Sequence, residues 1–283
     1  MSAGPEGLAP EALVRRLRTA GCVFAEEEAA LVLEQAREAA DPRAEVERMA
    51  AERERGLPLE QVLGWAVLAG VRVAVEPGVF VPRRRTELMV ATAAELAATV
   101  DPGREVVLLD LCCGSGVVAA AVGHALGGRR TRVVAADLDP AAVRCARRNL
   151  PGATVLRSDL FDDLPDDLRD RVDVLTANVP YVPSGALALM PREAREHEPR
   201  LALDGGDDGL AVLRRVAQAA PGWLAPGGTV LVETSEEQLP AALATFRGAG
   251  LDAAARSDDD LGATVALGTR RRSAAASAQQ PRR

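Results

Sequence analysis

Residues 106–116 read VVLLDLCCGSG, in which a run of aliphatic residues leads directly into a turn with two glycines. The run at 106–111 is typical of a buried strand, and the Ala-rich residues 116–126 after the turn favour a helix. Glycines at such a turn let a ligand approach the backbone, and the start of the helix offers free N–H groups. The stretch therefore predicts a strand, a ligand-binding loop and a helix in succession.

Further short aliphatic runs alternate with helical patterns along the rest of the chain. The candidate strands are residues 132–137, 154–157, 172–177, 229–234 and 262–267, and the candidate helices are residues 140–149, 209–220 and 237–249. Alternation of this kind predicts an α/β fold, in which a mostly parallel sheet carries helices on both faces.

The part of the chain before this alternation has a different pattern. Residues 9–55 are rich in Ala, Glu, Arg and Leu at helical spacing, with Leu13 and Leu17 on one face, and they predict a small helical bundle. Residues 65–81 alternate apolar with small or polar residues, which predicts a hairpin or an extended linker. We therefore divide the chain into a helical domain (1–63), a hairpin linker (64–82), an α/β domain (83–268) and a low-complexity basic tail (269–283) that we expect to be disordered.

Composition narrows the classes of function. Of the 283 residues, 48% are hydrophobic, which is enough for a core, and the net charge of −7 argues against a broad basic face for nucleic acid. The four cysteines form no CxxC pair and have no neighbouring histidine, so we predict no metal site. No apolar leader or run of about 18 apolar residues occurs, and we expect a cytoplasmic protein without membrane attachment.

The loop after the first strand indicates the class of ligand. The candidate strand 132–137 ends in Asp137, about twenty residues after the loop, where a carboxylate can accept hydrogen bonds from both ribose hydroxyls. The chain has no GxxxxGK[ST] loop and no lysine to neutralise a polyphosphate. A nucleoside ligand without phosphates fits best, and S-adenosylmethionine is the leading candidate, although a merely structural turn is the simpler alternative. The residues predicted to hold it here are Asp110, Cys112, Gly114, Gly116 and Asp137.

A second group of candidate ligand contacts follows the strand 154–157. Because ligands lie at the carboxyl edge of an open parallel sheet, Asp159 is placed to accept a hydrogen bond from an adenine amino group. Leu160 or Phe161 would then lie against the ring. The alternative is that Asp159 is a helix cap or turn residue.

The strand 172–177 ends in the turn Asn178-Val179-Pro180-Tyr181, which predicts the reacting group. A planar amide nitrogen is a poor nucleophile because its lone pair is delocalised. The Asn178 side-chain oxygen and a backbone carbonyl just after it can accept both N–H hydrogens and stabilise the positive charge that develops during methyl transfer. Tyr181 would stack on the planar group and Pro180 would stiffen the turn. An ordinary asparagine turn is the alternative. Asn178 also borders the predicted cofactor site.

These motifs resemble the protein-(glutamine-N5) methyltransferases of the PrmC/HemK family, which act on peptide-chain release factors. The likeness covers roughly residues 57–235. Besides the motifs above, it includes GLPLEQVLG at 56–64, PGVFVPRRRTE at 77–87 and HEPRLALDGGDDGL at 197–210. The resemblance implies a class I S-adenosylmethionine-dependent methyltransferase fold, which is Rossmann-like, with a helical N-terminal domain that recognises substrate. It further implies methylation of the glutamine in a Gly-Gly-Gln loop of a release factor.

The chain departs from the family pattern at three places. Val179 replaces the first proline of Asn-Pro-Pro-Tyr, Cys112 and Cys113 occupy a loop that usually begins Asp-Leu-Gly, and Arg84-Arg85 replace a Pro-acid pair. We therefore expect a divergent paralogue. Two alternatives stay open: an adenine-N6 methyltransferase, which the acidic charge and scarce aromatics disfavour, and a cofactor-binding protein without catalytic activity.

Overall fold

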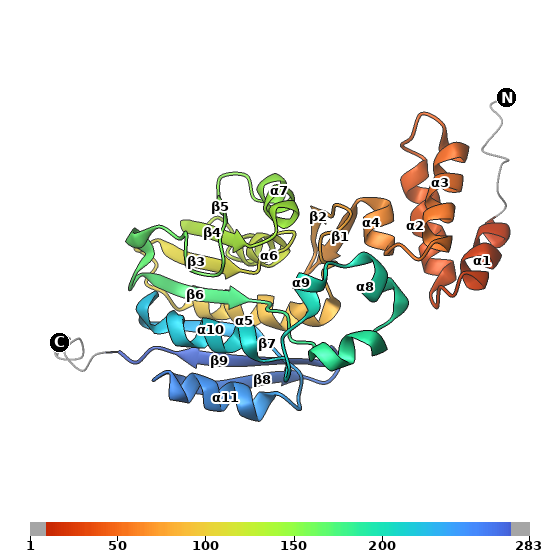
Figure 1. Ribbon diagram of the computed structural model, residues 1–283. Coiled ribbons are helices and arrows are strands. Elements are labelled where there is room, and N and C mark those ends of the chain that lie inside the picture. Colours follow the sequence, from red (N-terminus) through yellow and green to blue (C-terminus); the bar gives the residue numbers. More distant parts are fainter. Residues whose placement is uncertain (1–9, 273–283) are drawn as a thin grey trace.

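A seven-stranded sheet forms the centre of the protein in a computed structural model that describes residues 10–272 (Figure 1). The strand order is β5-β4-β3-β6-β7-β9-β8. The first five strands of this order are parallel, and β9 and β8 add an antiparallel edge. The strands are β3 (Val106–Leu111), β4 (Thr131–Asp137), β5 (Thr154–Arg157), β6 (Val172–Ala177), β7 (Leu224–Glu233), β8 (Asp252–Asp258) and β9 (Ala263–Thr269). The predicted α/β class is confirmed.

Helices cover both faces of this sheet. Side chains of α5, α6 and α7 pack on one face, whereas α10 and α11 pack on the other. Their bounds are α5 (Glu87–Ala98), α6 (Val117–Ala125), α7 (Pro140–Asn149), α10 (Ala211–Ala219) and α11 (Leu239–Gly248). Because the central strands β3 and β6 are covered from both sides, every residue in them is buried.

The structure contains elements that the sequence does not predict, and it moves the start of the C-terminal tail. Helix α5 and strand β8 were not predicted, and neither were the short helices α8 (Arg192–His197) and α9 (Arg200–Leu203). β8 has no aliphatic run that would predict a strand, because its sequence, DAAARSD, is largely exposed at the sheet edge. The tail does not begin at residue 269, since Thr269 pairs with Thr229 inside the sheet. Residues 273–283, and residues 1–9 of the helical domain, lie outside the described residues.

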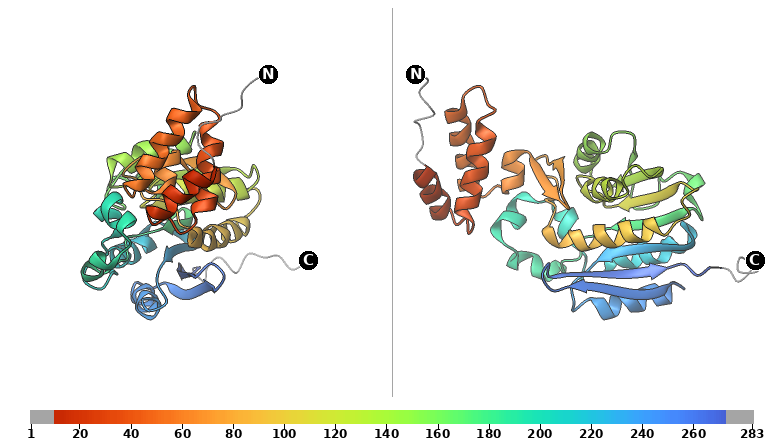
Figure 2. Two further views of the ribbon diagram at one scale, coloured as in Figure 1. Left: turned by 90° about the vertical axis from the view of Figure 1, so that its right-hand side faces the viewer. Right: turned by 180° about the vertical axis from the view of Figure 1, so that it is seen from behind.

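The N-terminal helices form a bundle with its own core beside the α/β body (Figure 2). The bundle contains α1 (Pro10–Thr19), α2 (Ala25–Ala36), α3 (Pro42–Glu54) and α4 (Leu59–Leu63). A hairpin of β1 (Trp65–Leu68) and β2 (Val71–Ala74) connects it to the body. None of the helices within residues 10–272 has the length and apolar character needed to cross a membrane.

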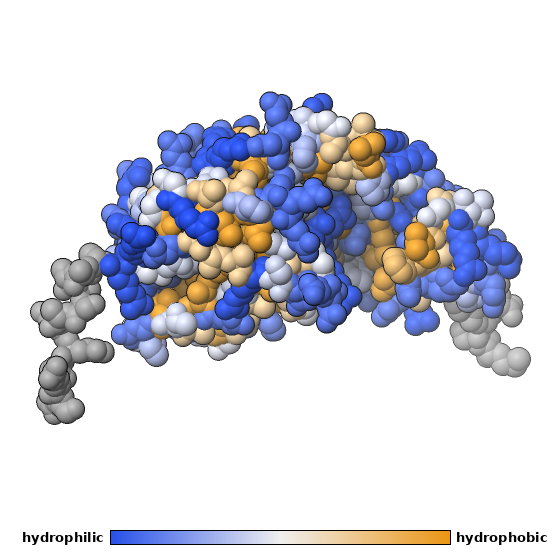
Figure 3. Space-filling view, turned by 90° about the horizontal axis from the view of Figure 1, so that it is seen from below, coloured by the Kyte–Doolittle hydropathy of each residue, from blue (hydrophilic) through white to orange (hydrophobic). Residues whose placement is uncertain are grey.

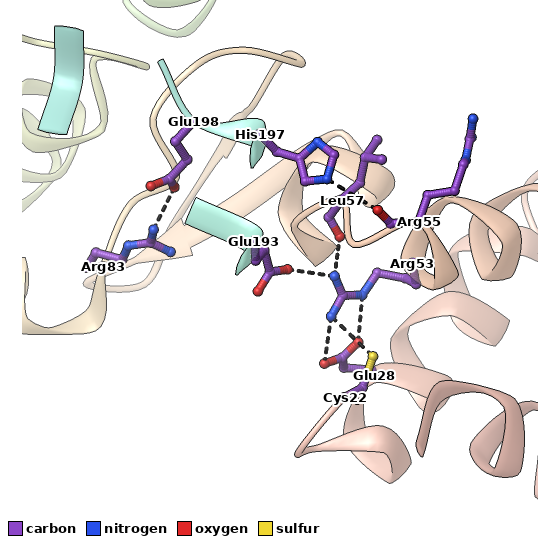
Figure 4. Close-up of polar contacts among 9 residues, drawn as sticks. All are labelled: Cys22, Glu28, Arg53, Arg55, Leu57, Arg83, Glu193, His197 and Glu198. Atoms are coloured by element: carbon purple, nitrogen blue, oxygen red, sulfur yellow. Dashed lines mark hydrogen bonds and ion pairs between the residues drawn. The ribbon is translucent and has the colours of Figure 1, made fainter. Parts of the chain in front are cut away.

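One arginine of the bundle bridges to the body (Figure 4). Arg53 on α3 is buried, and its Nε donates to Glu28 Oε2 of α2 at 2.8 Å. Its Nη1 donates to Glu193 Oε1 of α8 at 2.6 Å and also to the carbonyl of Leu57. A single guanidinium thus joins α3 to α2, to the turn between α3 and α4, and to α8, which follows the Asn178 turn in the chain.

Candidate active site

A cavity of about 350 Å³ lies at the carboxyl edge of the parallel strands. The glycine turn after β3, the residues after β4 and β5, and the turn after β6 all contribute to its wall. Further lining residues come from the segment 78–86 before α5, and from Met190, Pro199, Leu201, Ala202 and Leu203. The predicted site residues that line it are Asp110, Cys112, Gly114, Asp137, Asp159, Leu160, Asn178, Val179, Pro180 and Tyr181. The sheet topology therefore brings the residues predicted to bind cofactor and those predicted to orient the reacting group to one cavity.

The turn between β3 and α6 needs its two glycines for different reasons. Both have positive φ, +54° at Gly114 and +78° at Gly116. A Cβ at Gly114 would enter open space, whereas a Cβ at Gly116 would lie 2.8 Å from Leu150 Cδ1 and 3.2 Å from Ala146 Cβ. Gly114 lines the cavity, but Gly116 does not, and its role is to let α6 start close to α7.

Asp110 carries an unsatisfied acceptor at the end of β3. Its Oδ1 accepts from Thr176 Oγ1 at 2.8 Å, while its buried Oδ2 has no hydrogen-bond partner among residues 10–272. Burial raises the pKa of Asp110 from 3.8 to about 7. A buried carboxylate oxygen without a partner on a cavity wall is placed to accept from a cationic ligand group.

Asp137 is fixed by backbone amides at the end of β4. The N–H of Gly114 donates to Oδ2 and the N–H of Asp139 donates to Oδ1, both at 2.9 Å. Burial raises the pKa of Asp137 above its ordinary value. Each carboxylate oxygen keeps a second acceptor site, so the group remains able to accept hydrogen bonds from vicinal hydroxyls.

The residues after β5 only partly match their predicted roles. Asp159 lines the cavity, but its Oδ1 already pairs with Arg215 Nη2 at 2.9 Å. Leu160 has a φ of +54° and lines the cavity, whereas Phe161 is not among the lining residues. Phe161 is buried in the core, with its ring stacked on that of Trp223 at a centroid distance of 5.6 Å. Of the two residues proposed to contact the adenine ring, only Leu160 is positioned to do so, because the turn directs Phe161 into the core.

The turn after β6 lies against a polar network that the sequence analysis did not single out. Asn178 Nδ2 donates to Thr86 Oγ1 at 3.4 Å, and Thr86 Oγ1 donates to Glu233 Oε2 at 2.7 Å. Arg85 Nε donates to Glu233 Oε1 at 2.7 Å, and Arg85 Nη2 donates to the hydroxyl of Tyr181. Burial raises the pKa of Tyr181, although the Arg85 guanidinium beside it acts in the opposite direction. The sequence feature that could have indicated a functional role for Glu233 is that it is a lone acidic residue in the otherwise apolar candidate strand 229–234.

The arrangement fits S-adenosylmethionine by its donor and acceptor chemistry. The unpartnered Oδ2 of Asp110 suits the ammonium of the methionine part, and Asp137 suits the ribose hydroxyls. Open space beside Gly114 admits a ligand close to the backbone. Fold and cavity together define the class of the S-adenosylmethionine-dependent methyltransferases.

Comparison with known proteins narrows that class. A family model described as "Methyltransferase domain" matches residues 108–197. Release factor glutamine methyltransferase of Bordetella pertussis is 40% identical over 209 residues, which cover 72% of this chain and 74% of the relative. The chain belongs to the family of the release factor glutamine methyltransferases.

Two Streptomyces relatives show the breadth of this similarity. The release factor glutamine methyltransferase of Streptomyces coelicolor is 38% identical over 66% of each chain. The 4-amino-L-phenylalanine/4-methylamino-L-phenylalanine methyltransferase of Streptomyces pristinaespiralis is 39% identical over 68% of this chain and 66% of the relative. The chain thus spans just under two thirds of the length of these two proteins. Its sequence identity is nearly the same to an enzyme named for a protein substrate and to one named for a small-molecule substrate.

Proposed function

We propose that this protein transfers the methyl group of S-adenosylmethionine to the side-chain amide nitrogen (N5) of a glutamine in a protein, most plainly the Gly-Gly-Gln loop of a peptide-chain release factor. The observation that carries the proposal is that the Asn178–Tyr181 turn and the glycine turn share one cavity wall. The names of the relatives support the choice of acceptor.

The chain's own residues prepare the acceptor nitrogen. Asn178 Oδ1 and the carbonyl of Val179 accept the two amide N–H hydrogens, which orients the nitrogen and stabilises the charge that develops on it. Bound S-adenosylmethionine supplies the methyl group on a sulfonium leaving group. The nitrogen forms the new bond to the methyl carbon as the carbon–sulfur bond breaks, and the nitrogen then loses a proton to solvent. The ring of Tyr181, held by Arg85, covers the planar group.

An aromatic amine is the second candidate acceptor, and a specific feature of the site favours it. Arg85 lines the cavity at a position where the family pattern has an acidic residue. Its Nε and Nη2 donate to Glu233 and Tyr181, and its Nη1, which has no acceptor among residues 10–272, is left to donate to a carboxylate on a small substrate. The Streptomyces pristinaespiralis relative is named for such a substrate, an amino-substituted phenylalanine. An arylamine, like a glutamine amide, presents an NH₂ group whose lone pair is delocalised, in this case into the aromatic ring.

Transfer of labelled methyl from S-adenosylmethionine tests the proposal. The acceptors are a release factor, the same factor with its Gly-Gly-Gln glutamine changed to alanine, 4-aminophenylalanine, ribosomal protein and RNA. We expect label on the first factor and none on the alanine variant. Label on 4-aminophenylalanine alone selects the second candidate, and label on RNA alone selects the adenine-type alternative. Binding of S-adenosylmethionine with no transfer to any acceptor would overturn the proposal of activity.

A further inference from the structure

Asn178 is held by a chain of hydrogen bonds that runs through three elements. Glu233 at the end of β7 and Thr86 just before α5 are both buried, with 1% and 2% of their surface exposed. Asn178 follows β6, the strand next to β7 in the sheet. The contacts run from Asn178 Nδ2 through Thr86 Oγ1 to Glu233 Oε2.

The chemistry of the three groups allows only one direction of donation along these hydrogen bonds. A hydroxyl has a single proton to donate, and a carboxylate can only accept. Arg85 Nε donates to the other oxygen of Glu233 at 2.7 Å, which stabilises the ionised carboxylate. Thr86 must therefore give its proton to Glu233, and its oxygen is left as an acceptor for the neighbouring amide.

That direction fixes which end of the Asn178 amide faces the cavity. If the amide were reversed, Asn178 Oδ1 would face Thr86 Oγ1 with no proton between the two oxygens. With the NH₂ group donating to Thr86, Oδ1 is the end left for an acceptor role. We infer that Thr86 and Glu233 are positioning residues that hold the Asn178 amide with its oxygen available to the substrate nitrogen. The inference deepens the proposed function and rests on it for its kinetic consequence.

The kinetic test compares substitutions that differ only in the hydroxyl. Thr86→Val removes the hydroxyl at nearly constant volume, and Thr86→Ser retains it. Thr92→Val is the matched control, because Thr92 on α5 is buried as Thr86 is, and its hydroxyl has no partner within the described part of the chain. We expect Thr86→Val to lower kcat about tenfold or more with little change in S-adenosylmethionine affinity, whereas Thr86→Ser stays within about threefold of wild type. Thr92→Val should leave kcat unchanged.

A double-mutant cycle separates positioning from general stability. If Thr86 acts through Asn178, then Thr86→Val should lower kcat by less than about twofold in an Asn178→Ala background. Independent, multiplicative losses would overturn the inference. Should Thr86→Val fail to fold, Thr86→Ala removes the same hydroxyl with less bulk and permits the same comparison.

A spectroscopic measurement tests the inference without any methyl acceptor. The chain contains only two asparagines, Asn149 and Asn178, so asparagine-selective ¹⁵N labelling gives two pairs of side-chain NH₂ signals, which Asn178→Ala assigns. We expect Thr86→Val to shift the Asn178 pair and Thr92→Val to shift neither pair. An Asn178 pair unchanged by Thr86→Val would overturn the inference. If wild-type protein methylates no acceptor, the proposed function fails, and these signals still decide whether Thr86 holds the amide.

Discussion

The Asp110 carboxyl group shows at the scale of one residue how binding competes with stability. In the unfolded chain it ionises near 3.8, and in the folded protein near 7, because burial disfavours the charged form. Between these values the folded state binds a proton that the unfolded state does not. The group therefore destabilises the fold fully above pH 7, and this cost is relieved as the pH falls through 7.

Replacement of Asp110 by a residue that does not ionise should remove this destabilisation. We predict that Asp110→Asn raises the free energy of unfolding at pH 8 by up to about 4 kcal/mol, because the pKa of Asp110 rises from 3.8 to about 7 on folding, and that the effect at pH 5 is smaller. Urea denaturation at the two pH values measures it. Equal effects at both would contradict the assignment.

Affinity for S-adenosylmethionine should show the opposite dependence on pH. On the assignment of Asp110 to the cofactor's ammonium, only the ionised carboxylate binds that group strongly. We therefore predict that calorimetric affinity weakens as the pH falls from 8 to 6, and that Asp110→Asn binds weakly at both. An affinity in wild type that does not change between pH 8 and pH 6 would mean that Asp110 does not contact the ammonium.

The Asn178 turn allows a comparison between a side-chain and a backbone acceptor. We predict that Asn178→Ala lowers methyl transfer about a hundredfold or more, because it removes an acceptor needed in the transition state. Val179→Pro should change it about tenfold or less, since valine supplies the same carbonyl and the following Pro180 already favours an extended conformation. Initial rates on the accepted substrate decide this, and near-wild-type transfer by Asn178→Ala would refute the amide-orienting mechanism.

At the scale of elements, the Arg53 bridge decides how firmly α3 is attached to α2 and α8. Both Arg53 and Glu28 are largely buried, with 7% and 12% of their side chains exposed, so loss of one partner leaves a poorly solvated charge. We predict that Arg53→Met lowers the free energy of unfolding of the bundle by about 3 kcal/mol.

A second arginine on the same helix is the matched control for this prediction. Arg48 pairs with Glu45 and Glu52, but its side chain is 45% exposed, so Arg48→Met should cost less than about 1 kcal/mol. Hydrogen exchange across α1–α3 reports the local stability. Similar losses in the two variants would show that burial of the Arg53 bridge is unimportant.

At the scale of the whole molecule, the bundle and the cavity belong to separate parts of the fold. The bundle has its own core, and none of residues 10–77 lines the cavity. Large apolar side chains are exposed on the bundle, at Val23 and Phe24, and after the Asn178 turn, at Leu189 and Leu201. Seen from below, apolar surface appears on the α/β body and toward the bundle, among mostly hydrophilic side chains (Figure 3). This arrangement suits recognition of a protein by the bundle and chemistry in the cavity.

Deletion of residues 1–63 tests this division of labour. We predict that the shortened protein binds S-adenosylmethionine with unchanged affinity and no longer methylates a folded protein acceptor. Calorimetry and transfer of labelled methyl measure the two properties, and circular dichroism checks that the body stays folded. Parallel loss of binding and transfer in a folded deletion variant would place the bundle within the catalytic unit.

The sequence by itself determined the sheet-and-helix alternation, the glycine turn and the Asn178 turn. These features are local: aliphatic runs, glycines and a short polar turn specify strands and their ends within a few residues. Parallel topology then places the ends of β3 and β6 at one edge, so Asp110 and Asn178 could be assigned to one site before the structure was known.

Only the tertiary structure decided which side chains meet across long separations in sequence. Thr86 and Glu233 are 147 positions apart, and Arg53 and Glu193 are 140 apart, so no local pattern connects either pair. Phe161 and Leu160 are neighbouring apolar residues of one core cluster, yet Phe161 stacks on Trp223 and only Leu160 lines the cavity. The direction of a side chain after a turn depends on the φ and ψ of that turn and on the space left by packed neighbours, and both are properties of the folded chain.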